Sequence, residues 1–153
     1  RACRSVAFWV RVTNTAKPAG FHMTGETDLE KLLSEMKPEL HWDTYVFVTT
    51  TRDIAHLKIR PRMQFRETEG LTLVITRSEA EANSFAYTFP SRMITLDIHS
   101  SLEAVGFLAK IATRLAEIDI PVNAVAGFYH DHIFVAEDRA EDALAALEAM
   151  TGG

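Results

Sequence analysis

Four segments of the chain begin with the polar signature of a helix N-terminus. In each, a cap residue is followed three positions later by glutamate, so that the cap and the glutamate can satisfy free amides of the first turn. The pairs are Thr27 and Glu30, Ser78 and Glu81, Ser100 and Glu103, and Asp138 and Glu141. We therefore predict four helices, of which the one near residue 78 is short.

Three of these segments continue with apolar residues at helical spacing, which predicts helices with one buried face. Pro38, Pro121 and Gly152 mark where they end. The stripes consist of Leu29, Leu32, Leu33 and Met36; of Leu102, Val105, Leu108, Ala109, Ala112, Leu115 and Ala116; and of Ala140, Ala143, Leu144 and Leu147.

Runs rich in β-branched and aromatic residues, or alternating between apolar and polar positions, lie between these segments. They predict strands at 44–50, 62–67, 71–76, 92–98, 122–128 and 132–136, with 86–89 as a short further candidate and 6–12 as a strand near the N-terminus. The order resembles two ferredoxin-like halves, in which helices cover one face of an antiparallel sheet. The expected fold class is α+β, with two α/β sandwich modules meeting near Pro90; a single mixed α+β domain is the alternative.

Composition and charge narrow the functional classes. The net charge is −5, but residues 1–22 carry four cations and no acid, which leaves −9 on the rest of the chain. An acidic body disfavours nucleic acid as a partner, and no apolar run approaches the length of a membrane span. The single Cys3 excludes an internal disulfide and favours a cytoplasmic location. We read residues 1–22 as an extension of doubtful role ahead of a start at Met23, followed by modules at 23–89 and 90–153.

Four separated motifs carry a resemblance to a known family. The stretches GETDLEKLLSEMKPEL, FRETEGLTLV, SRMITLDIHSSLEAVG and VAGFYHDHIFV resemble a bacterial family of small tandem ACT-domain proteins. That family is related to the cytosolic arginine sensors and to the aspartokinase regulatory domain. The resemblance covers about residues 23–150. It implies a regulatory module that binds a small molecule, usually an amino acid, and has no catalytic activity and no cofactor.

The turn at residues 99–106 is the candidate ligand site. With Ser100 as a helix cap, the amides of Ser101 and Leu102 would lie where the helix dipole favours a carboxylate, while Glu103 would repel one. Gly106 would allow close approach. From ACT domains we carry over the start of the strand at 122–128 as the second wall. The expected ligand-binding residues are His99, Ser100, Ser101, Leu102, Val105, Gly106, Asn123, Ala124 and Val125. The alternative is an ordinary capped helix.

His130 and His132, separated by Asp131, suggest a metal site or a general base. A turn between two strands at this point would take the two imidazoles out of alignment, and zinc needs further ligands that do not stand out at suitable spacing. We expect a hairpin turn here, with no metal and no catalytic residue. Motifs of common hydrolases and phosphate-binding loops are absent from the sequence.

Three functional hypotheses follow. The first is a sensor that binds an amino acid and acts as a homodimer, because two-fold pairs are the commonest assembly. The second is a ligand-independent interaction module that pairs through a free sheet edge. The third is a small metal-dependent enzyme using His130 and His132.

Overall fold

The computed structural model describes residues 25–151, which form one antiparallel sheet flanked by helices. The strand predicted at 6–12 lies outside the described residues. The strands are β1 (Lys37–Thr50), β2 (Met63–Arg66), β3 (Leu71–Thr76), β4 (Thr88–Asp97), β5 (Asn123–Ala126) and β6 (Asp131–Ala136). The helices are α1 (Leu29–Glu35), α2 (Arg77–Ala82), α3 (Phe107–Ala116) and α4 (Ala140–Thr151), with a short 3₁₀ turn, η1 (Glu137–Arg139), ahead of α4.

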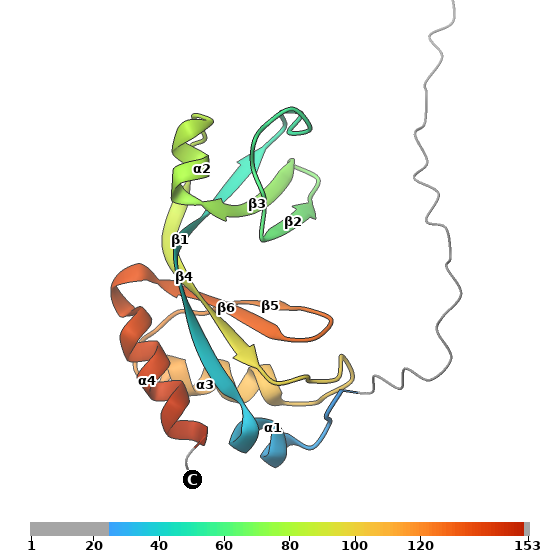
Figure 1. Cartoon of the computed structure of the whole chain (residues 1–153), viewed down its shortest axis with the longest axis vertical. Coiled ribbons are helices and arrows are strands. Elements are labelled where there is room, and N and C mark those ends of the chain that lie inside the picture. The colour runs from blue at the N-terminus through green and yellow to red at the C-terminus, as the bar shows by residue number, and fades with distance from the viewer. Residues whose placement is uncertain (1–24, 152–153) are drawn as a thin grey trace, which may run out of the picture.

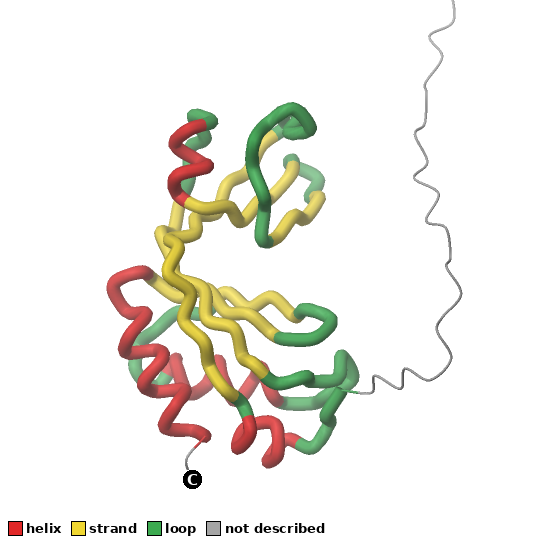
Figure 2. Tube along the Cα trace, in the orientation of Figure 1, coloured by secondary structure: helices red, strands yellow, loops and turns green. Residues whose placement is uncertain are grey.

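The strand order β2-β3-β1-β4-β6-β5 has the same plan from either end: an edge strand, its hairpin partner and a long central strand. The two central strands, β1 and β4, pair antiparallel and run through both halves of the molecule (Figure 1). The sheet curls strongly, so that the β2–β3 and β5–β6 hairpins project to the same side (Figure 2). This arrangement confirms the predicted α+β class with two ferredoxin-like halves.

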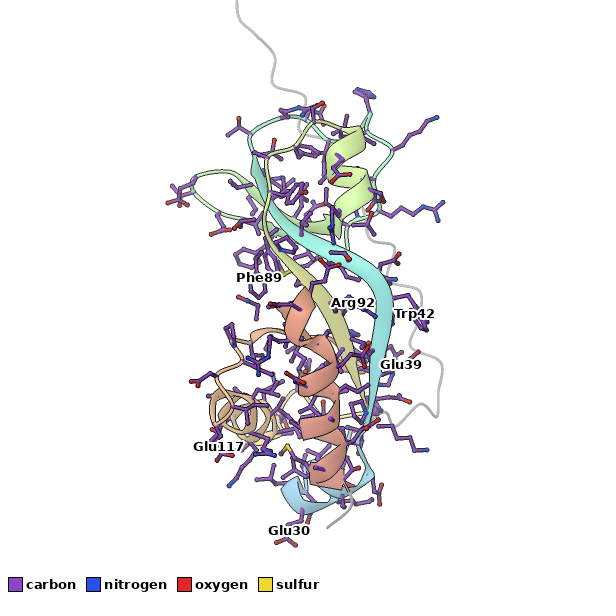
Figure 3. The ribbon with its side chains drawn as sticks, turned by 90° about the vertical axis from the view of Figure 1, so that its left-hand side faces the viewer. Glu30, Glu39, Trp42, Phe89, Arg92 and Glu117 are labelled. Atoms are coloured by element: carbon purple, nitrogen blue, oxygen red, sulfur yellow. The ribbon has the colours of Figure 1, made fainter. Side chains whose placement is uncertain are left out.

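Each half has its own core on the helix-covered face of the sheet. In the C-terminal half, α3 and α4 bury an apolar face against β4 and β6, as Ile111 and Leu147 show. Helix α1 joins this core through Leu32 and Met36. In the N-terminal half, α2 covers a smaller cluster that includes Val46 and Leu73. Figure 3 shows α4 alongside the two long strands, with Trp42 projecting from β1 on the other side.

The opposite sheet face carries a third cluster at the inside of the curl. Tyr45 and Phe134 pack edge to face with ring centroids 5.8 Å apart, and Met93 and Val74 are buried with them. Aromatic pairs of this geometry add stability beyond the area that they bury. This cluster lies where β1, β3, β4 and β6 lie side by side, so it joins the two halves.

None of the four predicted cap residues is a helix cap in the structure. Helix α1 is capped by Asp28, one residue after Thr27, and Asp138 lies within η1, ahead of α4. Helix α2 is capped by Thr76, whose side chain forms the reciprocal capping box with Glu79, instead of by Ser78. Helix α3 begins at Phe107, seven residues after Ser100, and its cap position is Gly106. Leu102 and Val105, predicted in the buried stripe, precede this helix and are exposed, because the face that packs on the sheet consists of Phe107, Ile111 and Leu115.

Candidate functional site

The loop that joins β4 to α3 is held in place by the segment that leads into α1. The amide of Glu26 donates to the carbonyl of His99 over 2.8 Å, and the amide of Ser101 donates to the carbonyl of Glu26 over 2.9 Å. Gly25 lies so close to this loop that a Cβ there would be 2.5 Å from the carbonyl carbon of Ser100. The expectation that the Ser101 amide is free to bind a ligand is therefore wrong.

Ser100 has a partner that local sequence does not reveal. Its hydroxyl donates to Oδ2 of Asp131 at the start of β6 over 3.0 Å, and both side chains are buried. Burial raises the pKa of Asp131 above its ordinary value, and the bond from Ser100 and the nearby His132 and His130 offset part of this rise. Among the described residues Asp131 has no ion-pair partner.

A hollow of about 150 Å³ lies between this loop, the start of α3 and the β5–β6 hairpin. The first turn of α3 forms one wall. Gly106 adopts φ +92° at the cap position and supplies no capping side chain. The first amides of a helix have no partners within it, and they carry the positive end of the helix dipole. The residues that line the hollow are Ser100, Ser101, Leu102, Ala104, Gly106, Phe107, Leu108, Ala109, Ala126 and Asp131.

A second hollow of about 280 Å³ lies on the outer side of the same loop, where Gly25, His99 and Phe128 meet Ser100–Glu103. Glu103 lines this outer hollow and is absent from the lining of the first one. Its amide donates to Oγ of Ser101 over 3.1 Å, which leaves the Ser101 hydroxyl hydrogen available to another acceptor.

The structure brings some of the predicted site residues together and separates others. Ser100, Ser101, Leu102 and Gly106 line the first hollow, and His99 lines the adjacent one. Strand β5 reaches the first hollow only at Ala126, so the three positions predicted from ACT domains are outside its lining, as is Val105. Those three positions are Asn123, Ala124 and Val125.

Asp131 and the first turn of α3 are the features that sequence reasoning missed. The sequence pattern predicted Asp131 only as a turn residue between two histidines. Its spacing of two from Ile133 and Val135 places it on the same buried face of β6. This alternation of positions along the strand could have predicted that Asp131 is buried. The true start of α3 was obscured because Ser100 and Glu103 fit a capping box.

The predicted hairpin is present, but its turn lies at residues 127–130 and does not separate His130 from His132. β5 and β6 pair antiparallel, and His130 lies in the turn before β6, with Nδ1 3.6 Å from Oδ1 of Asp97. His132 lies on β6, where Nδ1 is 3.0 Å from Oγ1 of Thr95, and the same oxygen is 2.8 Å from Nε2 of His41. Within residues 25–151, no three His, Cys, Asp or Glu side chains are placed to hold a metal ion.

Burial lowers the pKa of His132 below its ordinary value, and His130, His41 and Arg62 lower it further, against the opposing effect of Asp131. His132 is therefore neutral at neutral pH and accepts or donates through Thr95 according to its tautomer. This group belongs to the sheet face opposite the hollow, because His132 alternates with Asp131 along β6.

Comparison with known proteins gives a consistent picture. ACT domain models match residues 24–92 and residues 88–149. A solved protein of unknown function from Vibrio cholerae is 44% identical, with a TM-score of 0.74 over 80% of this chain and 95% of that one. No curated protein matches the chain.

More distant structures share the fold. The ligand-free regulatory subunit of aspartate kinase from Thermus thermophilus is 11% identical, with a TM-score of 0.57 over 74% of this chain and 95% of that one. A protein from Agrobacterium tumefaciens is 14% identical, with a TM-score of 0.62 over 76% of this chain and 89% of that one.

No helix within the described part of the chain is long and apolar enough to cross a membrane. ACT domains are typically regulatory ligand-binding domains, generally without catalytic activity. The chain belongs to the ACT-domain proteins and carries two ACT domains in tandem.

Proposed function

We propose that this protein is a regulatory module that binds a small amino acid in the hollow between α3 and the β5–β6 hairpin, and that it catalyses no reaction. The observation that carries the proposal is the chemistry of the two walls. One wall is an uncapped helix N-terminus and the other is a buried carboxylate, Asp131, in a single hollow. Together they match the opposite charges of an amino acid.

The carboxylate of the ligand would bind at the first turn of α3. The amides of Phe107, Leu108 and Ala109 are the donors that α3 itself leaves without acceptors, and the cap residue Gly106 has no side chain to occupy them. An anion at a helix N-terminus gains hydrogen bonds and a favourable dipole interaction. The free hydrogen of the Ser101 hydroxyl adds a further donor at this end.

The ammonium group of the ligand would bind at Asp131. Its carboxylate is buried, has a raised pKa and lacks an ion-pair partner among residues 25–151, although Ser100 satisfies one oxygen. A buried carboxylate without a cation is unfavourable, so a ligand ammonium would relieve a cost already present in the empty site. We also expect a simple anion such as acetate to bind poorly, because the Asp131 carboxylate would repel the negative charge of the anion.

The size of the hollow limits the ligand. At about 150 Å³ it is well below the roughly 300 to 1,000 Å³ of typical sites for drug-sized molecules. Ser100 and Gly106 would then shape the site, and Leu102 would cover its mouth. For His99, Val105, Asn123, Ala124 and Val125 the expected contact with ligand stays a prediction. Homodimerisation, the cytoplasmic location and the division into modules at residues 89 and 90 also stay predictions.

A thermal-shift screen against the standard amino acids at millimolar concentration tests the proposal. A ligand at 100 times its Kd raises the unfolding free energy by about 2.7 kcal/mol, which moves Tm by several degrees. We expect one or a few small amino acids to raise Tm in the wild type and none to do so in Asp131→Asn. The matched control is Asp119→Asn, an exposed aspartate at φ 56°, a conformation that asparagine tolerates. A flat screen with the wild type would contradict the proposal and favour the ligand-independent interaction module.

A further inference from the structure

Strand β1 is central in the strand order, but its first half lies at a free edge of the sheet. Strand β3 pairs with β1 only at residues 45–50, and β4 pairs with the other side of β1 from Lys37 onward. Within residues 25–151, no strand therefore pairs with the outer side of residues 37–43, which we call the free edge of β1. Pro38 suits this position, because proline lacks an amide hydrogen and is confined in sheets mainly to edges. A free edge can accept a further strand.

Apolar and polar residues alternate along the free edge of β1, whose sequence is KPELHWD. The side chain of Leu40 packs against the core of the C-terminal half, whereas Trp42 is 93% exposed. Between Leu40 and Thr44 the chain advances four residues along β1 but two along β4, and a bulge of this kind can re-aim a side chain. Trp42 projects from β1 away from α4 (Figure 3). Its exposed ring would gain from burial, and tryptophan is enriched at protein interfaces.

The charges of this edge are complementary to themselves in one register. When two copies run antiparallel with Leu40 opposite Leu40, Lys37 faces the partner's Asp43. In the same register Glu39 faces the partner's His41. Opposite charges across two strands stabilise their pairing, and like charges destabilise it. A shift by two residues in either direction would place Glu39 opposite a second acid, and a shift by one would place polar opposite apolar positions.

Other pairings lack this complementarity. Parallel pairing of the free edge of β1 with itself would place each charge opposite its own kind. The edge strand β2 carries Arg66 as its one charged residue, and the edge strand β5, Asn123–Ala126, carries none. Charge complementarity therefore selects a second copy of the same edge, in antiparallel orientation.

The polar side chains of the edge are available for such contacts. Lys37, Glu39 and Asp43 are exposed and form no ion pair within residues 25–151. His41 contacts Oγ1 of Thr95 through Nε2 over 2.8 Å. If Nε2 accepts from this hydroxyl, Nδ1 carries the hydrogen. That hydrogen could then be donated to the partner's Glu39.

The charged side chains of β4 beside this edge do not compete with the pairing. Arg92 donates from Nε to the main-chain carbonyl of residue 41 over 2.7 Å. Asp97 lies opposite Lys37 on β4, but its Oδ1 is 3.6 Å from Nδ1 of His130. A lysine ammonium has three donors, so Lys37 can serve both Asp97 and the partner's Asp43.

Charges at the two ends of the edge and over the whole molecule set the conditions for association. Arg77 and Glu137, beyond residue 44, pair with each other over 2.6 Å. Glu35 ends α1 on the other side and is exposed. Residues 25–151 carry 12 cations and 21 acids, so two copies repel each other at long range. At physiological ionic strength this repulsion is screened beyond about 8 Å, whereas the pairs across the edge are in contact.

We propose that the free edge of β1 is the interface of a homodimer, in which two copies pair antiparallel about Leu40 and join the two sheets into one. Two-fold symmetry makes each charge pair occur twice. On the apolar face of the joined strands, Pro38 covers the ring of the partner's Trp42. The edge is short, so we expect a weak dimer with a Kd of about 1–100 μM. This interface goes beyond the proposed amino-acid site, because no residue of the edge lines either of its hollows.

Sedimentation velocity of the full chain at physiological ionic strength, over concentrations up to about 100 μM, tests the proposal. We expect a reversible monomer–dimer equilibrium. Lys37→Glu and Asp43→Lys should each weaken dimerisation about tenfold or more, because an attractive pair becomes repulsive at two symmetric positions. An equimolar mixture of these two variants should dimerise like the wild type, since each chain then offers the opposite charge at both contacts. This recovery also shows that both variants are folded.

Two further variants separate this edge from other causes of association. Trp42→Ala should weaken the dimer about tenfold or more, because the ring that the partner covers is lost. The matched control is Lys110→Glu, an exposed position on α3 with the same change of charge, which should leave the dimer unchanged. A chain that is monomeric at every concentration would overturn the proposal. So would a dimer that Lys37→Glu does not weaken, an equal loss in Lys110→Glu, or a mixture of the two charge variants that stays monomeric.

Discussion

The hydroxyl of Ser100 donates to Oδ2 of Asp131 across 3.0 Å, and the two residues are separated by 31 positions in the sequence. This bond connects the loop after β4 to the start of β6 and defines the floor of the proposed ligand site. It holds a buried carboxylate in the lining of the hollow, where we propose that a ligand ammonium binds. Substitutions of Ser100 and of Asp131 should therefore have different effects on the unfolding free energy and on the affinity for ligand.

Asp131→Asn should abolish amino-acid binding while leaving the protein as stable as the wild type or more stable at neutral pH. Burial raises the pKa of Asp131, so ionisation of this carboxyl is less favourable in the folded state than in the unfolded chain. The amide can still accept the bond from Ser100. Urea unfolding at neutral pH measures this, with Asp119→Asn as the control. A large loss of stability would contradict the proposal that Asp131 is a carboxylate that lacks a cationic partner until the ligand binds.

The same pKa shift sets a pH dependence. Since the pKa of Asp131 is higher in the folded than in the unfolded chain, the folded state binds the proton more tightly between the two values. The unfolding free energy contributed by this group should fall as the pH rises through that window. Unfolding of the wild type and of Asp131→Asn from acidic to neutral pH should give a difference that grows with pH, and a constant difference would argue against the shift.

Ser100→Ala should mainly lower the stability of the fold, whereas Ser101→Ala should mainly weaken ligand binding. Removal of the buried Ser100 hydroxyl leaves the Asp131 carboxylate without its donor, which should cost about 1–3 kcal/mol of stability. Ser101 also lines the hollow, but its hydroxyl does not bond to Asp131. Removal of this hydroxyl should therefore weaken ligand binding and change the unfolding free energy by less than about 0.5 kcal/mol. Urea unfolding together with ligand titration separates the two. Equal stability losses would show that the Ser100 contact is not special.

Gly25→Ala should destabilise the protein and loosen the loop after β4. The added Cβ would lie 2.5 Å from backbone atoms of Ser100 and Ser101, which cannot move as a flexible side chain would. Overpacking of this kind typically costs about 1–3 kcal/mol. Amide hydrogen exchange should show faster exchange at Glu26 and Ser101, whose amides join the two segments. An unchanged exchange rate at both would contradict the role assigned to Gly25.

His132 should make the protein less stable in mild acid. Its pKa is lowered by burial and by the neighbouring His130, His41 and Arg62, so the unfolded chain binds the proton more tightly than the folded one. The stability of the neutral form is present above the unfolded pKa of about 6.5 and is lost as the pH falls toward the folded value. His132→Gln should flatten this dependence in urea unfolding between neutral pH and pH 5, and an unchanged dependence in this variant would contradict the role assigned to His132.

Much of the fold follows from local pattern, because alternation and helical spacing report directly on which face is buried. The strands at β3 and β6 and the buried stripe of α4 were predicted from such spacing, and Ala140, Ala143 and Leu147 are buried as expected. The start of α2 was misplaced because two overlapping cap signals, at Thr76 and at Ser78, are locally equivalent. They differ in tertiary packing: in the observed helix, Ala80 lies on the face of α2 that is buried in the core of the N-terminal half.

The site was predicted only in part, for a reason that is physical. The loop at 99–106 was identified, but its boundaries came from a capping motif whose serine bonds to Asp131 instead of to a helix amide. Such a long-range contact leaves no trace in the local spacing of residues. Gly106, with φ +92°, is what allows the chain to turn into α3, and its position marks the true helix start.

The most direct measurement is an amide NMR titration of the uniformly ¹⁵N-labelled protein with the amino acid that gives the largest thermal shift, or with pooled amino acids if none stands out. We expect the largest shift changes at the amides of Phe107, Leu108 and Ala109, with a change at Asp131, and no such changes in Asp131→Asn. Unchanged spectra at millimolar amino acid, or changes confined to residues outside the loop after β4, the first turn of α3 and the β5–β6 hairpin, would contradict the proposal that the loop after β4 forms an amino-acid site.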